Sequence, residues 1–356
     1  MPVVKGAILS TEEISSDERP VGPSVRVSVV GVGGAGNNLL SQAIGGGVSA
    51  SRCVAVNTDR SQLSRSLARN KVFLEQSISS ITPKLSKIRE NQRTFQSAAH
   101  RVTNYTDGSD FTIVLTGLGG STGTESAPII AQRSRTPVRP VVAVVAIPFI
   151  HERERRFVAL RGLKRMVDAC DCTIVIDNAI NRDYLRPSTT RSTDETASIA
   201  VRSLTELLSG AEDVDARDIL AVLSKGDLAT VCSFGLRTGD TLQSAVIQAL
   251  RTPSANLPLK DVKGALLLYR GPATLSTAQF AHAYDALVSL IGSDISFIHG
   301  STYSQSEPSV CLFLTGYRYS SALGGFADFV ELYDVEYGEE EGEEFTTLSL
   351  PLYQME

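Results

Sequence analysis

The sequence predicts an α/β fold with a parallel sheet that is covered by helices on both faces. From Val25 to Ile176, short runs rich in β-branched residues alternate with longer stretches of helical periodicity, a pattern typical of parallel sheets. The chain has 356 residues, of which 42% are hydrophobic, and this is enough for two packed domains with buried cores. We therefore expect a parallel-sheet domain followed by a smaller α/β domain.

The elements of the first domain follow from their sequence patterns. Apolar, β-branched runs predict strands at residues 25–30, 52–57, 111–116, 141–147 and 172–176. Helical periodicity predicts helices that begin at residues 36 and 124 and helices over residues 91–102 and 152–169. Residues 1–24 are polar and contain two prolines, which predicts a flexible tail. The first domain is accordingly expected over residues 25–190.

A long amphipathic helix is expected to connect the two domains. Ser192 and Glu195 have the spacing of a capping box, and the apolar stripe after them predicts a buried helix over residues 191–210. Strands at 228–234, 265–269, 295–298 and 310–314 and helices at 239–250 and 276–291 then predict a second domain over residues 211–319. Residues 320–356 contain an acidic run, which predicts a linker that ends in a short docking peptide.

Composition excludes several classes of function. The formal net charge is -5 and the acidic residues concentrate in residues 339–344, so no basic field attracts a nucleic acid. The five cysteines are scattered, which argues against disulfides and zinc-type spacing, and we identify no metal ligands. No signal peptide or apolar run long enough to span a bilayer is found. We expect a cytoplasmic protein that does not insert into the membrane.

The first glycine-rich loop follows the first predicted strand and reads Gly31-Val32-Gly33-Gly34-Ala35-Gly36-Asn37-Asn38. Without side chains, its backbone N–H groups can approach an anion, and the N-terminus of the next helix adds a positive dipole. The spacing also fits the G-x-G-x-x-G of dinucleotide-binding proteins, with Asp59 near the place of a ribose-binding acid. A phosphate site, an NAD-dependent oxidoreductase and a purely structural turn are all open at this point.

A second glycine-rich loop follows the strand at residues 111–116 and reads Gly117-Leu118-Gly119-Gly120-Ser121-Thr122-Gly123-Thr124. This loop also leads into a predicted helix. Two anion sites at helix starts in one sheet suit a triphosphate. An oxidoreductase would leave the second loop without a function.

The two loops resemble those of a known family. The first is similar to the G-V-G-G-A-G-N-N of FtsZ, and the second resembles the tubulin signature G-G-G-T-G-[ST], with Ser121 in place of the third glycine. The similarity covers residues 25–317 and is closest to prokaryotic FtsZ of the archaeal type. It implies the tubulin/FtsZ fold, in which a Rossmann-like GTPase domain is joined by a central helix to a smaller α/β domain. It also implies a cell-division GTPase of the cytoskeleton that binds GTP or GDP with Mg²⁺ and polymerises head to tail.

The resemblance assigns the phosphate contacts to residues of the two loops. They are Gly33, Gly34, Ala35, Gly36, Asn37, Gly119, Gly120, Ser121, Thr122, Gly123 and Thr124. Asn57 and Asp59 lie in a segment that is similar to the family's second nucleotide loop.

The ribose and the base are assigned in the same way. Residues 148–156 resemble the P-F-x-x-E-G-x-x-R loop, which places Glu152 at the ribose and Arg156 near the ribose or the phosphates. Ile176-Asp177-Asn178 resembles the I-P-N turn that meets guanine, and Asp194 lies where the family has Asn or Asp. A carboxylate there would accept the guanine N–H donors. Two alternatives stay open: a solvated helix face at residues 152–156, and a helix-start residue at Asp194.

An acidic loop after the central helix is similar to the family's N-x-D-x-x-D motif, which enters the nucleotide pocket of the next subunit. The resemblance assigns Asp215 and Asp218 as catalytic residues that polarise the attacking water. Hydrolysis would then depend on assembly. Without the resemblance, both acids are ordinary surface residues.

Three features leave the turnover rate and the partners open. Asp213 replaces the family's Asn. Residues 81–89 lack the glycines of the loop that senses the γ-phosphate in the family. In this segment, Lys84, Lys87 and Arg89 either contact the phosphate or are ordinary surface charges. A scaffold or filament regulator that binds nucleotide with little hydrolysis is therefore the alternative. Residues 345–356 alternate apolar side chains, as FtsZ tails do when they recruit membrane-anchoring adaptors. We expect these residues either to bind such an adaptor or to form a free tail. We also expect the protein at the division site.

Overall fold

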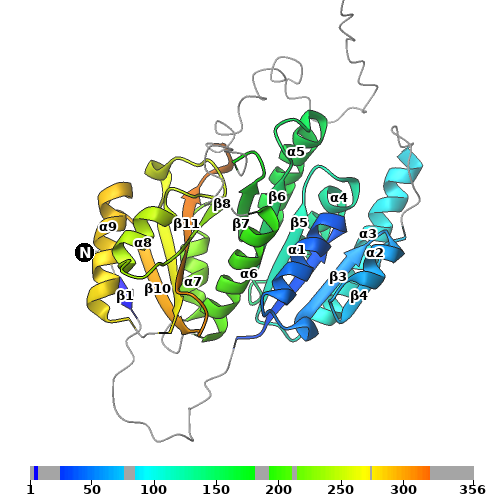
Figure 1. The fold of residues 1–356 in the computed structure, drawn as a ribbon. Coiled ribbons are helices and arrows are strands. Elements are labelled where there is room, and N and C mark those ends of the chain that lie inside the picture. The colour runs from blue at the N-terminus through cyan, green and yellow to red at the C-terminus, as the bar shows by residue number, and fades with distance from the viewer. Residues whose placement is uncertain are drawn as a thin grey trace, which may run out of the picture.

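The computed structural model describes residues 4–6, 25–75, 85–180, 192–210, 215–272 and 275–320, and the structural statements below concern these residues. Within them, eleven strands form one sheet in the order β1-β10-β9-β11-β8-β7-β6-β5-β2-β3-β4 (Figure 1). The strands pair in parallel except that β11 runs antiparallel to its neighbours β8 and β9. The predicted α/β class with a mostly parallel sheet is confirmed.

The first half of the chain supplies six parallel strands. They are β2 (Val27–Val32), β3 (Cys53–Asn57), β4 (Asn70–Phe73), β5 (Phe111–Gly117), β6 (Val141–Ile147) and β7 (Cys172–Asp177). Every residue of β2, β6 and β7 is buried. The near-continuous Val and Ile runs fit this position, because a strand of a covered parallel sheet is buried on both faces.

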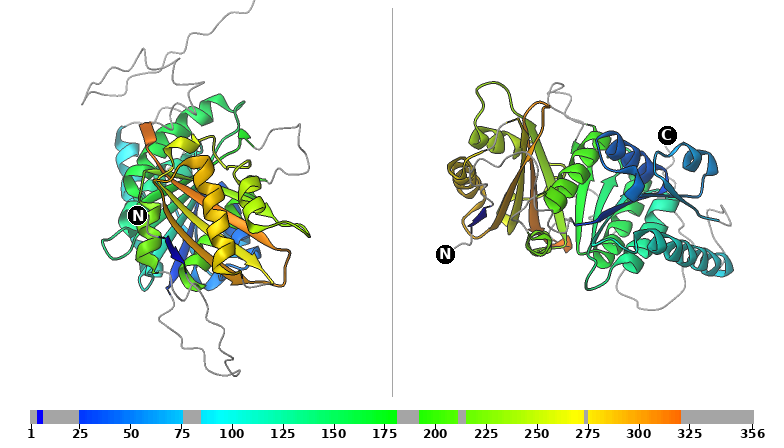
Figure 2. Two further views of the ribbon diagram at one scale, coloured as in Figure 1. Left: turned by 90° about the vertical axis from the view of Figure 1, so that its left-hand side faces the viewer. Right: turned by 90° about the horizontal axis from the view of Figure 1, so that it is seen from below.

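Helices cover both faces of the sheet, as the view from below in Figure 2 shows. One face packs against α1 (Gly33–Gly45), α2 (Arg60–Arg65) and α6 (Thr193–Gly210), which share a core with Val27, Ile113 and other strand residues. The opposite face packs against α3 (Leu85–Thr106), α4 (Ser121–Ser134) and α5 (Arg153–Ala169). A short 3₁₀ helix, η1 (Ala50–Arg52), precedes β3.

The second half adds four strands to the same sheet. They are β8 (Leu228–Gly235), β9 (Gly264–Gly271), β10 (Ser296–Tyr303) and β11 (Ser309–Tyr317). The helices of this half are α7 (Ala216–Leu223), α8 (Leu242–Ala249), η3 (Leu259–Asp261) and α9 (Thr277–Ile291). The sheet crosses the predicted domain boundary through two parallel residue pairs between β7 and β8, Thr173 with Leu228 and Ile174 with Ala229.

Several elements differ from the predicted ones. Residues 1–24 were expected to form a tail, but β1 (Val4–Gly6) pairs in parallel with β10 at the edge of the sheet. A strand of three residues gains its stability from the neighbouring strand rather than from its own sequence. The sequence also did not predict α2, β4 and α7, which are short. The other predicted strands and helices are present, with ends that shift by a few residues.

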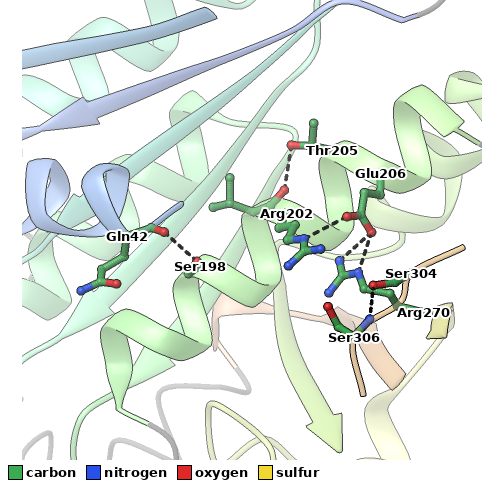
Figure 3. Close-up of polar contacts among 9 residues, drawn as sticks. Gln42, Ser198, Arg202, Thr205, Glu206, Arg270, Ser304 and Ser306 are labelled. Carbon is green, nitrogen blue, oxygen red and sulfur yellow. Dashed lines mark hydrogen bonds and ion pairs between the residues drawn. The ribbon is translucent and has the colours of Figure 1, made fainter. Parts of the chain in front are cut away.

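The central helix α6 contacts both halves of the molecule (Figure 3). The Ser198 hydroxyl donates to the Gln42 carbonyl oxygen of α1 at 3.1 Å. Further along α6, Glu206 accepts hydrogen bonds from Arg202 at 3.0 Å and from Arg270 of β9 at 3.1 Å. These contacts place the two ends of α6 at fixed positions relative to the sheet. No helix among the described residues is long and apolar enough to cross a membrane.

The pH dependence of stability is predicted to come in part from His299 on β10. This side chain is 2% exposed and stacks on Phe280 with a centroid distance of 4.0 Å. Burial lowers the pKa of His299 from 6.5 to about 4. As the pH falls, this imidazole therefore takes up a proton in the unfolded chain before it does so in the folded protein. The free energy of unfolding should therefore fall by on the order of 3 kcal/mol between about pH 6.5 and 4.

Urea denaturation at a series of pH values tests this expectation. The His299→Leu variant should lose less stability than the parent over that range, whereas His282→Gln, at an exposed position, should follow the parent. Parallel curves for the parent and His299→Leu would contradict the assignment.

Candidate functional site

The two glycine-rich loops lie at one edge of the sheet, where the carboxyl ends of the parallel strands meet. From β2 the chain proceeds to β3 and β4 on one side, and then returns to β5, β6 and β7 on the other. This reversal between β2 and β5 is the position where open α/β sheets bind ligands. The first glycine loop follows β2 and the second follows β5, so the topology brings the predicted phosphate contacts together.

Both loops lead into helices whose first N–H groups have no side-chain cap. The N-cap residue of α1 is Val32 and that of α4 is Gly120, and neither makes a side-chain capping hydrogen bond. The N–H groups of a helix's first turn lack partners within the helix, and the helix dipole makes this end positive. Two such ends on neighbouring strands form a site suited to several phosphate groups.

The two loops touch each other and the loop after β3. Gly33 has a φ of +75°, and a side-chain carbon built there would lie 3.1 Å from the backbone nitrogen of Gly123. The hydroxyl of Thr58 lies 3.1 Å from that of Thr122. Three of the predicted nucleotide-binding segments therefore share one surface.

Close backbone packing explains two of the glycines. A side-chain carbon on Gly36 would come within 3.0 Å of the Leu115 carbonyl oxygen, and one on Gly123 would lie 2.5 Å from the Gly117 carbonyl oxygen. Gly36 is thus required for the contact of α1 with β5. Gly120 differs, because nothing lies within 4 Å of the position of its missing side chain. Gly120 therefore leaves space in which a ligand can approach the backbone.

Asn37 fixes the start of α1 from inside the site. Its amide nitrogen donates to the carbonyl oxygens of Gly33 at 2.9 Å and Val56 at 3.0 Å. The side chain is buried, and its Oδ1 atom has no hydrogen-bond partner among the described residues. Asn37 links the first glycine loop to β3 and keeps an acceptor that a ligand or water can use.

The loop after β3 is held by its own side chains. Asn57 accepts from the backbone nitrogens of Thr58 at 2.8 Å and Asp59 at 3.2 Å. Asp59 caps α2 by accepting from Ser61 at 2.7 Å, so the structure gives this carboxylate a structural role. Asn57 also donates to Gln62 at 3.0 Å.

Gln62 is a further candidate site residue that the sequence did not suggest. Its Oε1 atom lies 2.9 Å from the position of a side chain on Gly34, so it contacts the first glycine loop. The signal that could have indicated it is an N-cap at Asp59, which would place position 62 in the first turn of a helix.

The second loop is shaped by a hydrogen bond inside it. Gly119 has a φ of +88° and donates from its backbone nitrogen to the Thr124 hydroxyl at 2.9 Å. Thr124 is buried, whereas Ser121 is exposed at the start of α4. The side chain of Ala35 packs against the position of Gly117. Of the predicted contacts in this loop, Ser121 is open to a ligand and Thr124 is engaged in the turn.

The predicted ribose contacts lie after β6. Glu152 accepts from the Phe149 backbone nitrogen at 3.1 Å and pairs with Arg155. Arg156 is buried and forms two hydrogen bonds with Asp177, at 2.7 and 2.6 Å, so its guanidinium is directed into the protein. The sequence placed this cation near the ribose or phosphates and did not indicate its pairing with Asp177.

The predicted guanine contacts lie at the start of α6. Asn178 follows β7, and its side-chain oxygen accepts a hydrogen bond from the Thr193 hydroxyl. Asp194 lies in the first turn of α6 and is partly exposed. These two residues share one end of the molecule with the glycine loops.

Asp215 and Asp218 lie at the opposite end of the molecule. Asp215 caps α7 by accepting from the Arg217 backbone nitrogen at 2.9 Å and is exposed, while Asp218 lies in the first turn of that helix. α6 has 18 residues and separates the two ends by about 27 Å. The acids therefore cannot reach the glycine loops of their own chain.

The structure contains few other candidate groups. The five cysteines are buried and free, and burial raises the pKa of Cys53 and Cys172 to about 12, so they are poor nucleophiles. Among the described residues, no group of three His, Cys, Asp or Glu side chains could hold a metal ion. A pocket of about 350 Å³ lies at the amino-terminal end of β7, lined by Arg135, Asp171 and Lys225 among others, away from the loops. Residues 81–84, Asp213 and residues 345–356 lie outside the described residues.

Comparison with known proteins shows what this chain is similar to. Residues 26–183 match the Tubulin/FtsZ family, GTPase domain. The cell division protein FtsZ 1 of Pyrococcus horikoshii is 32% identical over 256 residues, which cover 69% of this chain and 68% of that protein. An empty FtsZ dimer of M. jannaschii is 28% identical with a TM-score of 0.70, covering 82% of this chain and 88% of that one. A GTPγS-bound protofilament of CetZ2 from Haloferax volcanii is 21% identical with a TM-score of 0.69, covering 87% of this chain and 99% of that one. At this identity, the similarity shows the fold alone.

The packing at Gly36 generates a testable prediction. The Gly36→Ala variant should lose about 1–3 kcal/mol of stability and bind guanine nucleotide poorly, because the start of α1 must move away from β5. Gly45→Ala is a matched control in the same helix, since nothing lies within 4 Å of its missing side chain. Thermal unfolding and equilibrium binding of GTP check both. Normal GTP binding by Gly36→Ala would show that the position of α1 is not critical.

Proposed function

Because this chain belongs to the Tubulin/FtsZ family of GTPases, we propose that it binds GTP at the glycine loops, polymerises head to tail and hydrolyses GTP between subunits. The family and the tubulin/FtsZ fold expected from the two loops are confirmed. The observation that supports nucleotide binding most strongly is the pair of uncapped helix N-termini at the reversal between β2 and β5.

The site offers separate contacts to each part of a nucleotide. The backbone N–H groups at the starts of α1 and α4 bind the phosphates, and Glu152 binds the ribose. Asn178 and Asp194 bind the base, whose N–H donors a carboxylate accepts. The solved CetZ2 protofilament of Haloferax volcanii, which has the same fold, contains GTPγS.

The oxygen atoms at the junction of the loops fit a magnesium ion. Mg²⁺ prefers hard oxygen ligands, and beside phosphates and water it is held by one or two carboxylates or, in P-loop proteins, by a Ser or Thr hydroxyl. The hydroxyls of Thr58 and Thr122, 3.1 Å apart, are such groups and would hold the ion beside the phosphates. When bound, Mg²⁺ neutralises charge on the phosphate oxygens.

The positions of the acids support hydrolysis between subunits. Asp215 and Asp218 lie at the end of the molecule opposite the glycine loops, so stacking one subunit on the next brings them to the neighbour's phosphates. Carboxylates there accept hydrogen bonds from a water and orient it for attack on the γ-phosphate. Hydrolysis then requires a polymer, and a monomer binds GTP without turning it over.

A nucleotide-binding scaffold with little hydrolysis is the alternative. The observation that favours it is that two arginines near the ribose loop are paired with acids, Arg155 with Glu152 and Arg156 with Asp177. Neither then neutralises charge that develops on the phosphates, which lowers the expected rate. Participation in cell division, a position at the division site and recruitment of an adaptor by residues 345–356 stay predictions.

Mixing two inactive variants tests catalysis between subunits. Asp215→Ala keeps its glycine loops and Gly36→Ala keeps its acids, so each alone should lose about 100-fold or more of its GTP turnover. Their mixture should recover turnover at the junctions where intact loops meet intact acids. Asp240→Ala is the control, because Asp240 is another exposed acid that accepts from a backbone nitrogen. If both variants are folded and sediment together but their mixture recovers no turnover, a site shared by two subunits is ruled out.

A further inference from the structure

The pair formed by Arg156 and Asp177 is more deeply buried than any other described ion pair. The two side chains are 5% and 4% exposed. Both guanidinium nitrogens at the end of Arg156 bond to Asp177, Nη1 to Oδ1 at 2.7 Å and Nη2 to Oδ2 at 2.6 Å. This two-bond geometry fixes the orientation of both groups.

The pair connects the two loops that carry the ribose and base contacts. Arg156 lies in the first turn of α5, directly after the loop with Glu152, and its Nη1 also donates to the Pro148 carbonyl oxygen at 2.6 Å. Asp177 is the last residue of β7, and its Oδ1 also accepts from the backbone nitrogen of Ala179 at 2.9 Å. The contacts therefore hold the chain on both sides of Asn178 to the chain on both sides of Glu152.

Burial makes a direct contact of Arg156 with the phosphates unfavourable. To reach a ligand, the guanidinium would have to leave Asp177, and an unpaired carboxylate would stay in the protein interior. The pair is neutral as a whole, so it adds no net positive charge to the phosphate region. Its effect on a ligand must pass through the residues that it positions.

We infer that Arg156 and Asp177 are positioning residues, which set the spacing between Glu152 and Asn178 and thereby the fit of the nucleoside part of GTP. This inference rests on the proposed GTP site and concerns its ribose and base end. It predicts that removing the pair weakens the binding of GDP and of GTP by the same factor. It also predicts that Asp177 matters as much as Arg156.

Equilibrium binding of GTP and of GDP to the full chain tests the inference in Arg156→Lys and Asp177→Asn, at a temperature where circular dichroism shows each variant to be folded. Both variants should bind both nucleotides about tenfold or more weakly, with an unchanged ratio of GTP to GDP affinity. Arg135→Lys is the matched control, because Arg135 pairs with Asp171 at the other end of β7, and it should change either affinity by about twofold or less.

Two results would overturn the inference. If Asp177 only restrains Arg156, Asp177→Asn releases this arginine toward the phosphates, and unchanged or tighter GTP binding by the variant would show that. If Arg156→Lys loses clearly more affinity for GTP than for GDP, Arg156 itself contacts the γ-phosphate. If Asp177→Asn does not fold, the double variant Arg156→Met with Asp177→Leu replaces it, since it leaves no unpaired buried charge.

Hydrogen exchange separates this inference from the proposed function. Without any nucleotide, Arg156→Lys should speed the exchange of backbone amides in residues 148–152 and 177–180, while Arg135→Lys should not. If the parent chain binds neither GTP nor GDP, the proposed function fails, and the exchange result still decides whether the pair holds the two loops. Unchanged exchange in both segments would overturn the positioning role.

Discussion

The close approach of two helix starts to one edge of the sheet is the constraint on which the rest of the site depends. α1 can begin beside β5 only because Gly36 has no side chain, and the second loop can lie against the first only because Gly33 has none. Gly123 has no room for a side chain either, because the Gly117 carbonyl oxygen of its own loop lies there. This packing aligns the free N–H groups of two helices at one point, where they attract negative charge. Backbone groups supply this attraction, and the nearby Arg155 and Arg156 are paired with Glu152 and Asp177.

The central helix divides the chemistry between the two ends of the molecule. α6 begins beside Asn178 and ends before Asp215 and Asp218, so its length sets the distance between the proposed nucleotide contacts and the proposed catalytic acids. Hydrogen bonds from α6 to α1 and to β9 keep both ends in place. In the proposed function, a site split in this way is completed only by a second subunit, which would connect the fold directly to assembly.

Local patterns in the sequence predicted the elements whose own residues determine them. The Val and Ile run of β6 was placed at its observed bounds, and the two glycine loops led to the correct family. Elements that depend on distant partners were not predictable. β1 is a strand because β10 lies beside it, and α7 has only eight residues. The contact of Arg156 with Asp177 joins residues that are 21 positions apart, and no local pattern indicates it. Asp59 caps α2 in the structure, and its contact with nucleotide stays a prediction.

GTP turnover per molecule as a function of protein concentration, with sedimentation of the same samples in magnesium buffer, tests the central claim most directly. If the site is completed between subunits, turnover per molecule rises steeply at the concentration where the protein begins to pellet. Turnover per molecule that is constant with concentration, or that is substantial while the protein stays in the supernatant, would contradict a catalytic site shared by two subunits.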